Sequence, residues 1–363
     1  MQFNELMKIS NSVNIERQAA IAIEEFLGQL PQFSLTHIAR SGDPDSADTG
    51  LDIVVEGRFA DKPLQLIVEV KGNGQPRNVR QAAEQLNRHL RQHPTQAIPV
   101  VMAPYLSRQA REVCREERVG YLDFMGNALI AFDAVYIERE VPGQPEAERR
   151  ALRSLYKPKS ARILRMLLRE PGRSWRTAEL ADAADVSAGL VSTVGAALRE
   201  RGWAEQTDLG LVLIDPNTLL DSWSENYEPP RGEEFRRYTT LHSNGLELRL
   251  REMSKAHGRV TLASFSAAQW LAPYVRHPNT YLYADEAGLA ALDKLLDLKQ
   301  SSTGSNVVIV VPEEDGVLDD AICVADTIVV TSPVQTYLDL QRAGDRGAEG
   351  ALELRHQMLD WKS

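Results

Sequence analysis

Two carboxylates and a lysine stand where they could share one site in the first third of this 363-residue chain. Asp52 sits in an apolar stretch, and Glu69 and Lys71 close an apolar run over residues 64–71. Such a run is typical of a strand covered on both faces, and alternation puts Glu69 and Lys71 on the same face. If the stretch around Asp52 is a second strand, paired through a turn at residues 60–63, Asp52 and Glu69 converge at one edge of the sheet. Isolated charges are costly to bury, so this set indicates a site.

These residue types suit the hydrolysis of a phosphodiester bond. Two carboxylates supply the oxygen ligands that Mg²⁺ prefers, and the bound cation polarises a phosphoryl oxygen. A nearby ammonium group orients the attacking water and offsets the charge that develops on the phosphate. The prediction is a catalytic set of Asp52, Glu69 and Lys71 with Mg²⁺ or Mn²⁺ as cofactor. The alternative is a surface ion pair, because one Asp and one Glu-x-Lys also occur together by chance.

Asp52, followed after a turn by Glu69-Val70-Lys71, resembles the motif of the PD-(D/E)XK nuclease superfamily. The resemblance implies a restriction-endonuclease-like domain with a mixed sheet over residues 1–140. One departure is Leu51, which stands where the family motif has proline. Domains of this kind also persist as inactive DNA-binding or structural modules.

Members of that superfamily often add a glutamate from the first helix and a glutamine from the helix after the Glu-x-Lys strand. Glu24 or Glu25, on a helix expected at residues 17–27, and Gln85, on a helix expected at residues 77–90, occupy matching places. The resemblance therefore implies that Glu25 joins Asp52 and Glu69 as a metal ligand and that Gln85 joins the catalytic residues.

Composition is that of a soluble globular protein with two or three domains, since 43% of residues are hydrophobic and 25% are charged. No apolar run approaches the roughly 20 residues of a membrane span. The N-terminus lacks the pattern of a secretory signal, and the isolated Cys114 and Cys323 indicate neither a disulfide framework nor a zinc site. We expect a cytoplasmic, nucleoid-associated protein with no membrane partner.

The net charge of −10 is unevenly distributed. Residues 149–176 hold ten basic side chains and a single acid, Glu170, whereas the part of the chain after residue 222 is strongly acidic. Concentrated positive charge matters more for phosphate binding than the total does. The basic run therefore predicts double-stranded DNA as a partner.

After a basic linker at residues 141–157, the periodicity predicts three helices and a hairpin within residues 158–215. The helices are expected at residues 160–169, 178–184 and 188–200, and the hairpin at residues 203–207 and 211–214. This order resembles the winged helix-turn-helix of bacterial transcription regulators, which implies that the third helix enters the major groove. The alternative is a winged helix that packs against another protein.

The DNA contacts expected of this domain fall into two groups. Phosphate contacts are expected from Lys159, Arg162, Arg165, Arg173 and Arg176. The third helix would present Ser187 as N-cap, followed by Gly189, Ser192, Thr193 and Arg199. These side chains offer few of the forked donors that read bases, so base readout is expected to be modest. Gly195 within this helix suggests a close approach to a neighbour.

A second linker, residues 216–234, leads to a domain at residues 235–363 in which helix and strand patterns alternate. The segments 262–270 and 332–340, together with Gly344-Asp345-Arg346-Gly347, resemble the C-terminal part of AbiEi-type proteins, the antitoxin regulators of type IV toxin–antitoxin systems. With the winged helix, this resemblance covers about residues 150–363. It implies a nucleotidyltransferase-like α/β domain and a cognate toxin protein as partner. The Gly-Ser turn and the Asp-x-Asp pair of transferases are absent, so we expect a non-catalytic module.

The fold class expected is therefore a multidomain α/β and α+β protein, and two functions remain open. In the first, the chain is a DNA-binding transcriptional regulator of AbiEi antitoxin type with a nuclease-like N-terminal domain. In the second, it is a Mg²⁺-dependent endonuclease targeted by its winged helix. An RNA-directed nuclease is a third alternative. Winged-helix regulators often dimerise to read two half-sites, so a homodimer is expected.

Overall fold

A computed structural model describes residues 2–41, 50–60, 62–133, 135–252, 258–275, 277–300, 304–325 and 327–361. Residues 42–49, shortly before Asp52, lie outside this description. The chain divides into two compact units, one of Met1–Arg150 with Leu198–Gly202 and one of Ala151–Ala197 with Trp203–Ser363. Within the described residues each unit is built on a seven-stranded mixed sheet carrying helices, so the expected mixed α/β architecture is confirmed.

The strands of the N-terminal sheet lie side by side in chain order. They are β1 (Phe33–Arg40), β2 (Ile53–Phe59), β3 (Lys62–Val70), β4 (Ile98–Ala103), β5 (Gly120–Asp123), β6 (Ala128–Phe132) and β7 (Val135–Arg139). The central strands β3, β4 and β5 are parallel, and the outer pairs are antiparallel. Parallel neighbours need crossover connections, which α2 (Pro76–Gln92) and α3 (Arg108–Glu116) supply.

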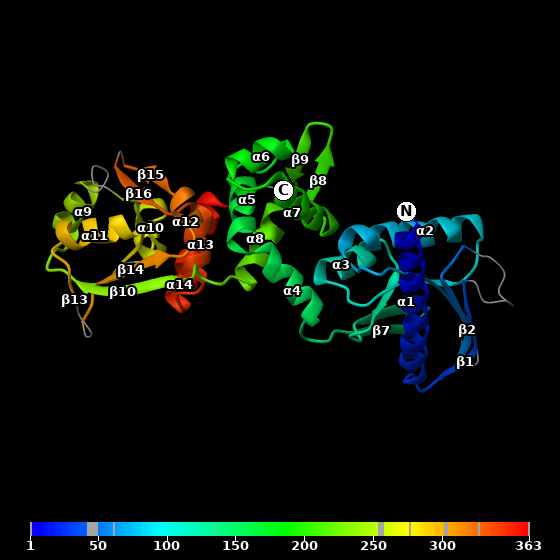
Figure 1. Cartoon of the computed structure of the whole chain (residues 1–363). Helices are drawn as coiled ribbons and strands as arrows, with labels where there is room; N and C mark the ends of the chain where they lie inside the picture. Colours follow the sequence, from blue (N-terminus) through cyan, green and yellow to red (C-terminus); the bar gives the residue numbers. More distant parts are fainter. Residues whose placement is uncertain are drawn as a thin grey trace. The chain divides into compact units, whose positions relative to one another are not determined.

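Helices cover both faces of this sheet (Figure 1). The helix α1 (Gln2–Gly28) packs Ile23 against Val68 on one face, while α2 and α3 pack against Ile67 and its neighbours on the other. Successive residues of β3 thus enter different cores, which is why this strand is almost wholly apolar. The first helix begins well before residue 17, where the sequence predicted its start.

The three predicted helices and the hairpin form at the expected positions in the middle of the chain. They are α5 (Pro158–Arg169), α6 (Thr177–Ala183), α7 (Ala188–Glu200), β8 (Ala204–Thr207) and β9 (Gly210–Leu213). The close approach expected at Gly195 is to the hairpin, since a Cβ there would lie 3.2 Å from the side chain of Leu211. The stretch predicted as a linker instead forms α4 (Glu146–Leu155), because Leu152 and Leu155 share one buried stripe.

The C-terminal sheet has the strand order β13-β10-β14-β12-β11-β16-β15. Its strands are β10 (Gly232–Tyr238), β11 (Val260–Leu262), β12 (Thr280–Ala284), β13 (Lys299–Gln300), β14 (Val307–Pro312), β15 (Ile322–Val324) and β16 (Ile328–Val330). The helices of this region are α8 (Pro216–Glu225), α9 (Ser243–Glu252), α10 (Ser264–Leu271), α11 (Glu286–Leu295), α12 (Gly316–Asp319), α13 (Pro333–Gln341) and α14 (Asp345–Met358). Sequence reasoning missed β10, because this mostly exposed strand is charged and carries little apolar alternation.

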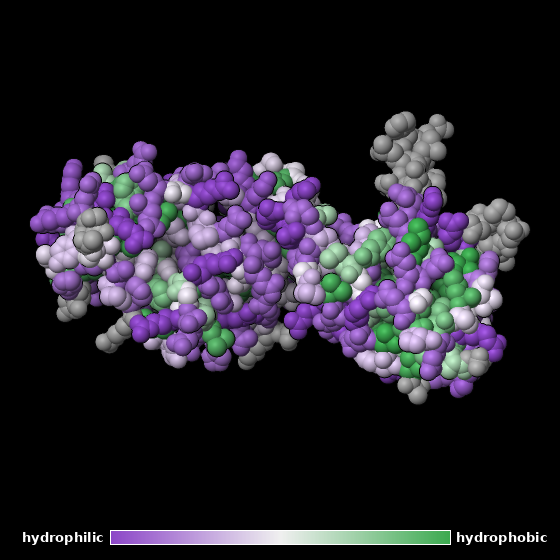
Figure 2. All heavy atoms as spheres, turned by 90° about the horizontal axis from the view of Figure 1, so that it is seen from below, coloured by the Kyte–Doolittle hydropathy of each residue, from purple (hydrophilic) through white to green (hydrophobic). Residues whose placement is uncertain are grey.

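The surface of the two units differs in polarity on the face drawn in Figure 2, where hydrophobic residues gather over the N-terminal unit. Large exposed apolar side chains of that unit include Ile21, Leu35 and Tyr136. Exposed apolar side chains are ordinary on a protein surface, of which apolar atoms make up more than half. Among the described residues, no helix is both long and apolar enough to cross a membrane.

Candidate functional site

The antiparallel pairing of β2 with β3 brings Asp52 and Glu69 to one end of the N-terminal sheet. Ile53 pairs with Val68, so the residues that flank this pair, Asp52 and Glu69, lie at neighbouring positions. The backbone N–H of Val70 donates a hydrogen bond of 2.7 Å to Asp52 Oδ2. This bond fixes the Asp52 carboxylate against the end of β3, with its second oxygen available for another ligand.

Glu69 is held from two sides, although only 3% of it is exposed. Lys71 Nζ donates to Glu69 Oε1 at 2.8 Å, and Gln85 Nε2 donates to Glu69 Oε2 at 3.0 Å. The pair on β3 follows from strand alternation, whereas Gln85 arrives from α2, whose neighbouring residues Ala82 and Leu86 are buried against the sheet. The structure therefore brings together Asp52, Glu69, Lys71 and Gln85 as the sequence predicted.

Burial destabilises the charged forms of both carboxylates. The pKa of Asp52 is raised by desolvation, although the hydrogen bond from Val70 and the charge of Lys71 act in the opposite direction. The pKa of Glu69 is also raised by desolvation, and the charge of Asp52 raises it further, while Lys71 and Gln85 lower it. Two buried acids that repel each other are stabilised when a cation binds between them.

The chemistry of this donor set fits a Mg²⁺ or Mn²⁺ ion. Mg²⁺ keeps several of its waters and is commonly held by one or two carboxylates together with a substrate phosphate. Asp52 and Glu69 are two such ligands, and each carboxylate has lone pairs beyond those used in the hydrogen bonds above. Within the described part of the chain, no third His, Cys, Asp or Glu completes a cluster with them.

Glu25 is not brought to this pair, contrary to what the family resemblance implied. Its side chain, like that of Glu24, is exposed on α1. The half-buried Glu16 instead shares the core-facing stripe of Ala20 and Ile23. The preceding residue, Ile15, comes within 3.3 Å of the place where a Cβ on Gly72 would lie, beside the end of β3. The signal was in the sequence, since Glu16 lies one turn before Ala20 on that stripe and directly before the predicted start of the helix.

A further acid, Asp123, shapes the backbone at the end of β5. It accepts hydrogen bonds from the backbone N–H groups of Leu106 and Asn127, at 3.0 and 2.9 Å, and from the Asn127 side chain at 2.8 Å. All these partners are part of the fold, and 1% of Asp123 is exposed. Its role is to hold the turn at residues 124–127.

The arginines predicted to hold DNA phosphates include several that bind carboxylates of their own unit instead. Arg165 is buried, donates to Gln335 Oε1 at 2.6 Å and lies 3.8 Å from Asp320. Arg162 pairs with Asp185 at 3.2 Å and with Asp319 at 3.1 Å. Arg162 and Arg165 are paired in this way because tertiary packing places acidic and amide groups of α12, α13 and the residue after α12 against α5.

The remaining predicted DNA contacts are closer to the surface. Arg173 is bound to Glu170 and Glu179 and stacks on Trp175. Exposed positions are found at Lys159, Arg176, Ser187, Gly189, Ser192 and Thr193, while Arg199 is half-buried. The hydroxyls of Ser192 and Thr193 each donate to a backbone carbonyl of α7 at 3.0 Å, and the Ser187 hydroxyl accepts from the Leu190 N–H as the predicted N-cap.

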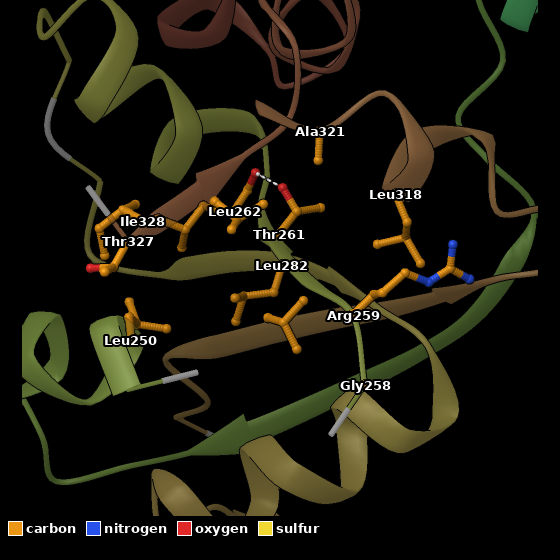
Figure 3. A pocket seen from close by; sticks show the side chains of 12 residues that line it. Leu250, Gly258, Arg259, Thr261, Leu262, Leu282, Leu318, Ala321, Thr327 and Ile328 are labelled. Atoms are coloured by element: carbon orange, nitrogen blue, oxygen red, sulfur yellow. Dashed lines mark hydrogen bonds between the residues drawn. The ribbon is translucent and has the colours of Figure 1, made fainter. Parts of the chain in front are cut away.

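A small cavity in the C-terminal sheet offers no comparable chemistry. It measures about 280 Å³ and is lined by residues of β11, β12 and β16 and by apolar side chains such as Leu250, Leu282 and Ile328 (Figure 3). Arg259 in its wall is paired with Asp285, Asp315 and Asp319. The Thr261 hydroxyl donates to the carbonyl of Leu262, as Figure 3 shows.

Comparison with protein families identifies the C-terminal part of the chain. Residues 212–360 match the family model described as transcriptional regulator, AbiEi antitoxin, type IV toxin–antitoxin system. The predicted AbiEi resemblance is confirmed for this segment. The AbiEi match begins at β9, so α5, α6 and α7 lie before it. No curated protein matches the chain.

Two solved structures show limited similarity to this chain. The structure of EndoMS in apo form is 18% identical, with a TM-score of 0.21, and covers 29% of this chain and 45% of that one. The EndoMS complex with double-stranded DNA is 19% identical, with a TM-score of 0.19, and covers 27% and 41%. The chain thus spans less than half the length of these proteins, and TM-scores of this size do not establish a shared fold.

Proposed function

We propose that this chain is a DNA-binding regulator of AbiEi antitoxin type whose N-terminal unit hydrolyses DNA phosphodiester bonds with Mg²⁺ or Mn²⁺. The observation that carries the catalytic part is the convergence of Asp52, Glu69, Lys71 and Gln85 at one end of the sheet. The strand order and the crossover helices around them support a restriction-endonuclease-like fold for this unit.

Each side chain has a separate task in this reaction. Asp52 and Glu69 would hold the metal ion, which supplies Lewis-acid polarisation of the phosphoryl group when bound. Lys71 keeps a positive charge beside the carboxylates, where it can donate to the attacking water or to a phosphate oxygen. Gln85 fixes the orientation of Glu69 through its amide N–H, which limits the reorganisation needed when substrate binds.

Targeting to DNA is assigned to the helical segment in the middle of the chain. The order α5, α6, α7 and the β8–β9 hairpin supports a winged helix-turn-helix, with α7 presented to the major groove. Lys159 and Arg176, both exposed, are the phosphate contacts that this arrangement favours. Ser187, Gly189, Ser192 and Thr193 give α7 a small, weakly polar surface, which suits modest base discrimination.

The alternative is regulation without cleavage, and the family match at residues 212–360 favours it. In that case the N-terminal unit contributes shape and DNA contact, and a cognate toxin protein and a second copy of the chain are the expected partners. The C-terminal α/β region, proposed to be nucleotidyltransferase-like in fold, then serves as a non-catalytic interaction module.

A nuclease assay on the full chain separates these functions. Supercoiled and linear duplex DNA, single-stranded DNA and RNA are incubated with the protein and Mg²⁺ or Mn²⁺, with parallel samples in EDTA. Metal-dependent nicking of DNA that EDTA abolishes is the expected result. Retention of DNA in a mobility-shift assay without cleavage of any substrate would leave the regulator alone, and cleavage of RNA only would replace DNA as the substrate.

A further inference from the structure

The helix that carries Gln85 has a second, charged face with no role in the reaction described above. Ala82 and Leu86 of α2 are buried against the sheet, and Gln85 is half-buried at the edge of that face. The opposite side of α2 is exposed and polar, and it carries Arg77, Gln81, Glu84, Arg88 and Arg91. The three arginines of this side, Arg77, Arg88 and Arg91, form what we call the arginine stripe.

The arginine stripe has no partner in its own fold. Among the described residues, none of its three guanidinium groups forms an ion pair or a hydrogen bond. Arg80 of the same helix behaves differently, since it turns toward α3 and pairs with Glu116 at 3.3 Å and with Glu117 at 3.0 Å. Arg111 and Arg115 of α3 are paired with carboxylates as well. Arginines that face a neighbouring element are thus paired within the fold, whereas those of the stripe are open to a ligand from solvent.

The stripe runs past the catalytic residues. Arg88 follows Gln85 by three residues, and positions with this spacing lie about 5–6 Å apart at Cβ on a helix. Gln85 in turn donates to Glu69 at 3.0 Å. At the other end of the stripe, Arg77 lies in the first turn of α2, six residues after Lys71. A DNA strand with one phosphate at the carboxylates would therefore bring its neighbouring phosphates close to the stripe.

The length of the stripe suits a polyanion. Arg77 and Arg88 are 11 residues apart, which is about three helical turns, so their side chains leave α2 in nearly the same direction. They lie about 16 Å apart along the helix axis, and Arg91 extends the row to about 21 Å. Each strand of duplex DNA carries one charge per roughly 3.4 Å of its axis, so this row has the length of about six successive phosphates. A single small anion would engage only one end of it.

Helix stability alone does not account for the stripe. The N-terminus of a helix carries partial positive charge, so a cation is favourable in the last turn and unfavourable in the first. Arg91 follows this preference, but Arg77 stands in a first turn that has no acid, after an N-cap residue without a side-chain capping bond. Glu84 is the single acid of α2, and a helical pair with Arg88 four residues later contributes only about 0.2–0.5 kcal/mol. Positive charge therefore remains in excess along this face.

We propose that the arginine stripe of α2 binds the phosphate backbone of double-stranded DNA and holds the duplex across the catalytic residues. The proposal rests on the proposed function for the identity of its partner, and it adds a DNA contact outside the winged helix-turn-helix. Arg77 and Arg88 would contact phosphates that flank the reacting one, so they bind substrate without taking part in the chemical step.

The salt dependence of duplex binding by the full chain tests this surface, measured in EDTA so that no DNA is cleaved. Arg77→Gln and Arg88→Gln keep a good helix former and remove one charge each. Each should weaken binding about 5- to 10-fold near 0.1 M salt and lower the magnitude of the slope of log K against log salt by about 1. Arg80→Gln is the matched control, because it removes the same charge from the same helix where it is already paired. Its effect should stay below about 2-fold.

Photo-crosslinking places the contact directly. In a Cys323→Ser background, which removes the exposed cysteine and keeps the buried Cys114, Arg88→Cys and Arg80→Cys are labelled with an aryl azide and irradiated with duplex DNA. The Arg88→Cys adduct should crosslink to DNA, and the Arg80→Cys adduct should not.

Unchanged affinity and slope in Arg77→Gln and Arg88→Gln would overturn the proposal. Equal losses in Arg80→Gln, or equal crosslinking from both positions, would reduce the stripe to general electrostatic attraction and overturn it as well. Binding through the stripe by a chain that cleaves no DNA would contradict only the catalytic part of the proposed function. Where cleavage occurs, the stripe variants should raise KM and leave kcat unchanged, and a cleaving chain that tolerates both changes would contradict only the present proposal.

Discussion

The charged residues at the end of β2 and β3 and those on α5 look equally promising in the sequence, but the structure treats them differently. In the N-terminal unit, Asp52 and Glu69 are half to fully buried, repel each other and are only partly compensated by Lys71. On α5, Arg162 and Arg165 meet carboxylates or an amide from other elements of the same unit. In a functional site, some charged groups are not fully compensated by their neighbours in the fold. In a structural network, each charge is paired with groups of the same fold.

The largest effect is expected when the unsatisfied pair is broken. Asp52→Asn keeps the shape of the side chain and the hydrogen bond from Val70 but weakens metal binding, so Mg²⁺-dependent nicking should fall by about 10³-fold. The measurement is the initial rate of nicking of supercoiled DNA across a Mg²⁺ titration. Glu56→Gln is the control: this exposed acid lies on β2, four residues after Asp52, and its variant should retain full activity. Equal activity of Asp52→Asn and wild type would show that this pair is structural, like the arginines of α5.

The opposite expectation holds for Arg165, where the loss should be in stability. Arg165→Met removes a buried cation, leaves Gln335 Oε1 without its donor and leaves Asp320 with Arg169 as its remaining ion-pair partner, which should lower the free energy of unfolding by about 3 kcal/mol. Denaturant titration of the C-terminal unit's transition measures this change. Lys159→Met, on the exposed side of the same helix, should change it by less than about 0.5 kcal/mol. A stable Arg165→Met variant with weakened DNA binding would restore the role first predicted for this residue.

A buried acid of the same network predicts how stability depends on pH. Asp339 accepts hydrogen bonds from Tyr227 and Gln335, and burial raises its pKa from 3.8 to about 6. The folded state therefore binds more protons than the unfolded state between these values, so the contribution of Asp339 is fully present below about pH 4 and is lost as pH rises through 6.

Asp339→Asn should remove this pH dependence. In the wild type, the contribution of Asp339 to the free energy of unfolding is expected to change by on the order of 2 kcal/mol between pH 4 and pH 7. The amide retains an acceptor for Tyr227 and Gln335, so the variant is expected to fold. The quantity to compare is the difference in free energy of unfolding between wild type and variant at each pH, which cancels the other acids. A difference that does not vary with pH would show that Asp339 is already ionised in the fold.

The smallest effect is expected from the cations that remain exposed. Lys159→Ala and Arg176→Ala should each weaken the salt dependence of duplex binding. The slope of the logarithm of the association constant against the logarithm of the salt concentration should fall in magnitude by about 1, and by a similar amount for different DNA sequences. Mobility-shift or anisotropy titrations at several salt concentrations give the slope. Arg162→Ala should leave it unchanged, because that guanidinium is already paired with Asp185 and Asp319. An equal change in all three variants would mean that the ion pairs of α5 open when DNA binds.

Sequence patterns predicted most of the elements that carry these residues. Apolar alternation and the positions of Gly and Pro placed β2, β3, α2 and the α5 to β9 segment within a few residues. Two elements were missed in part or in full. The start of α1 was missed although Phe3, Leu6 and Met7 are spaced as on one helix face. The strand β10 was missed because its charged residues hide the strand pattern. Where a segment's burial depends on another part of the chain, local periodicity carries little signal.

The sequence by itself determined that Asp52, Glu69 and Lys71 lie at the end of one sheet, because strand alternation and a short turn are local properties of the backbone. Tertiary structure decided which of the arginines remain available and that Glu25 stays away from the acids. These outcomes depend on α12, α13 and the rotation of α1, all of which are fixed by packing between segments distant in sequence. Charge neutralisation acts through space, so a count of basic residues along the chain could not reveal it.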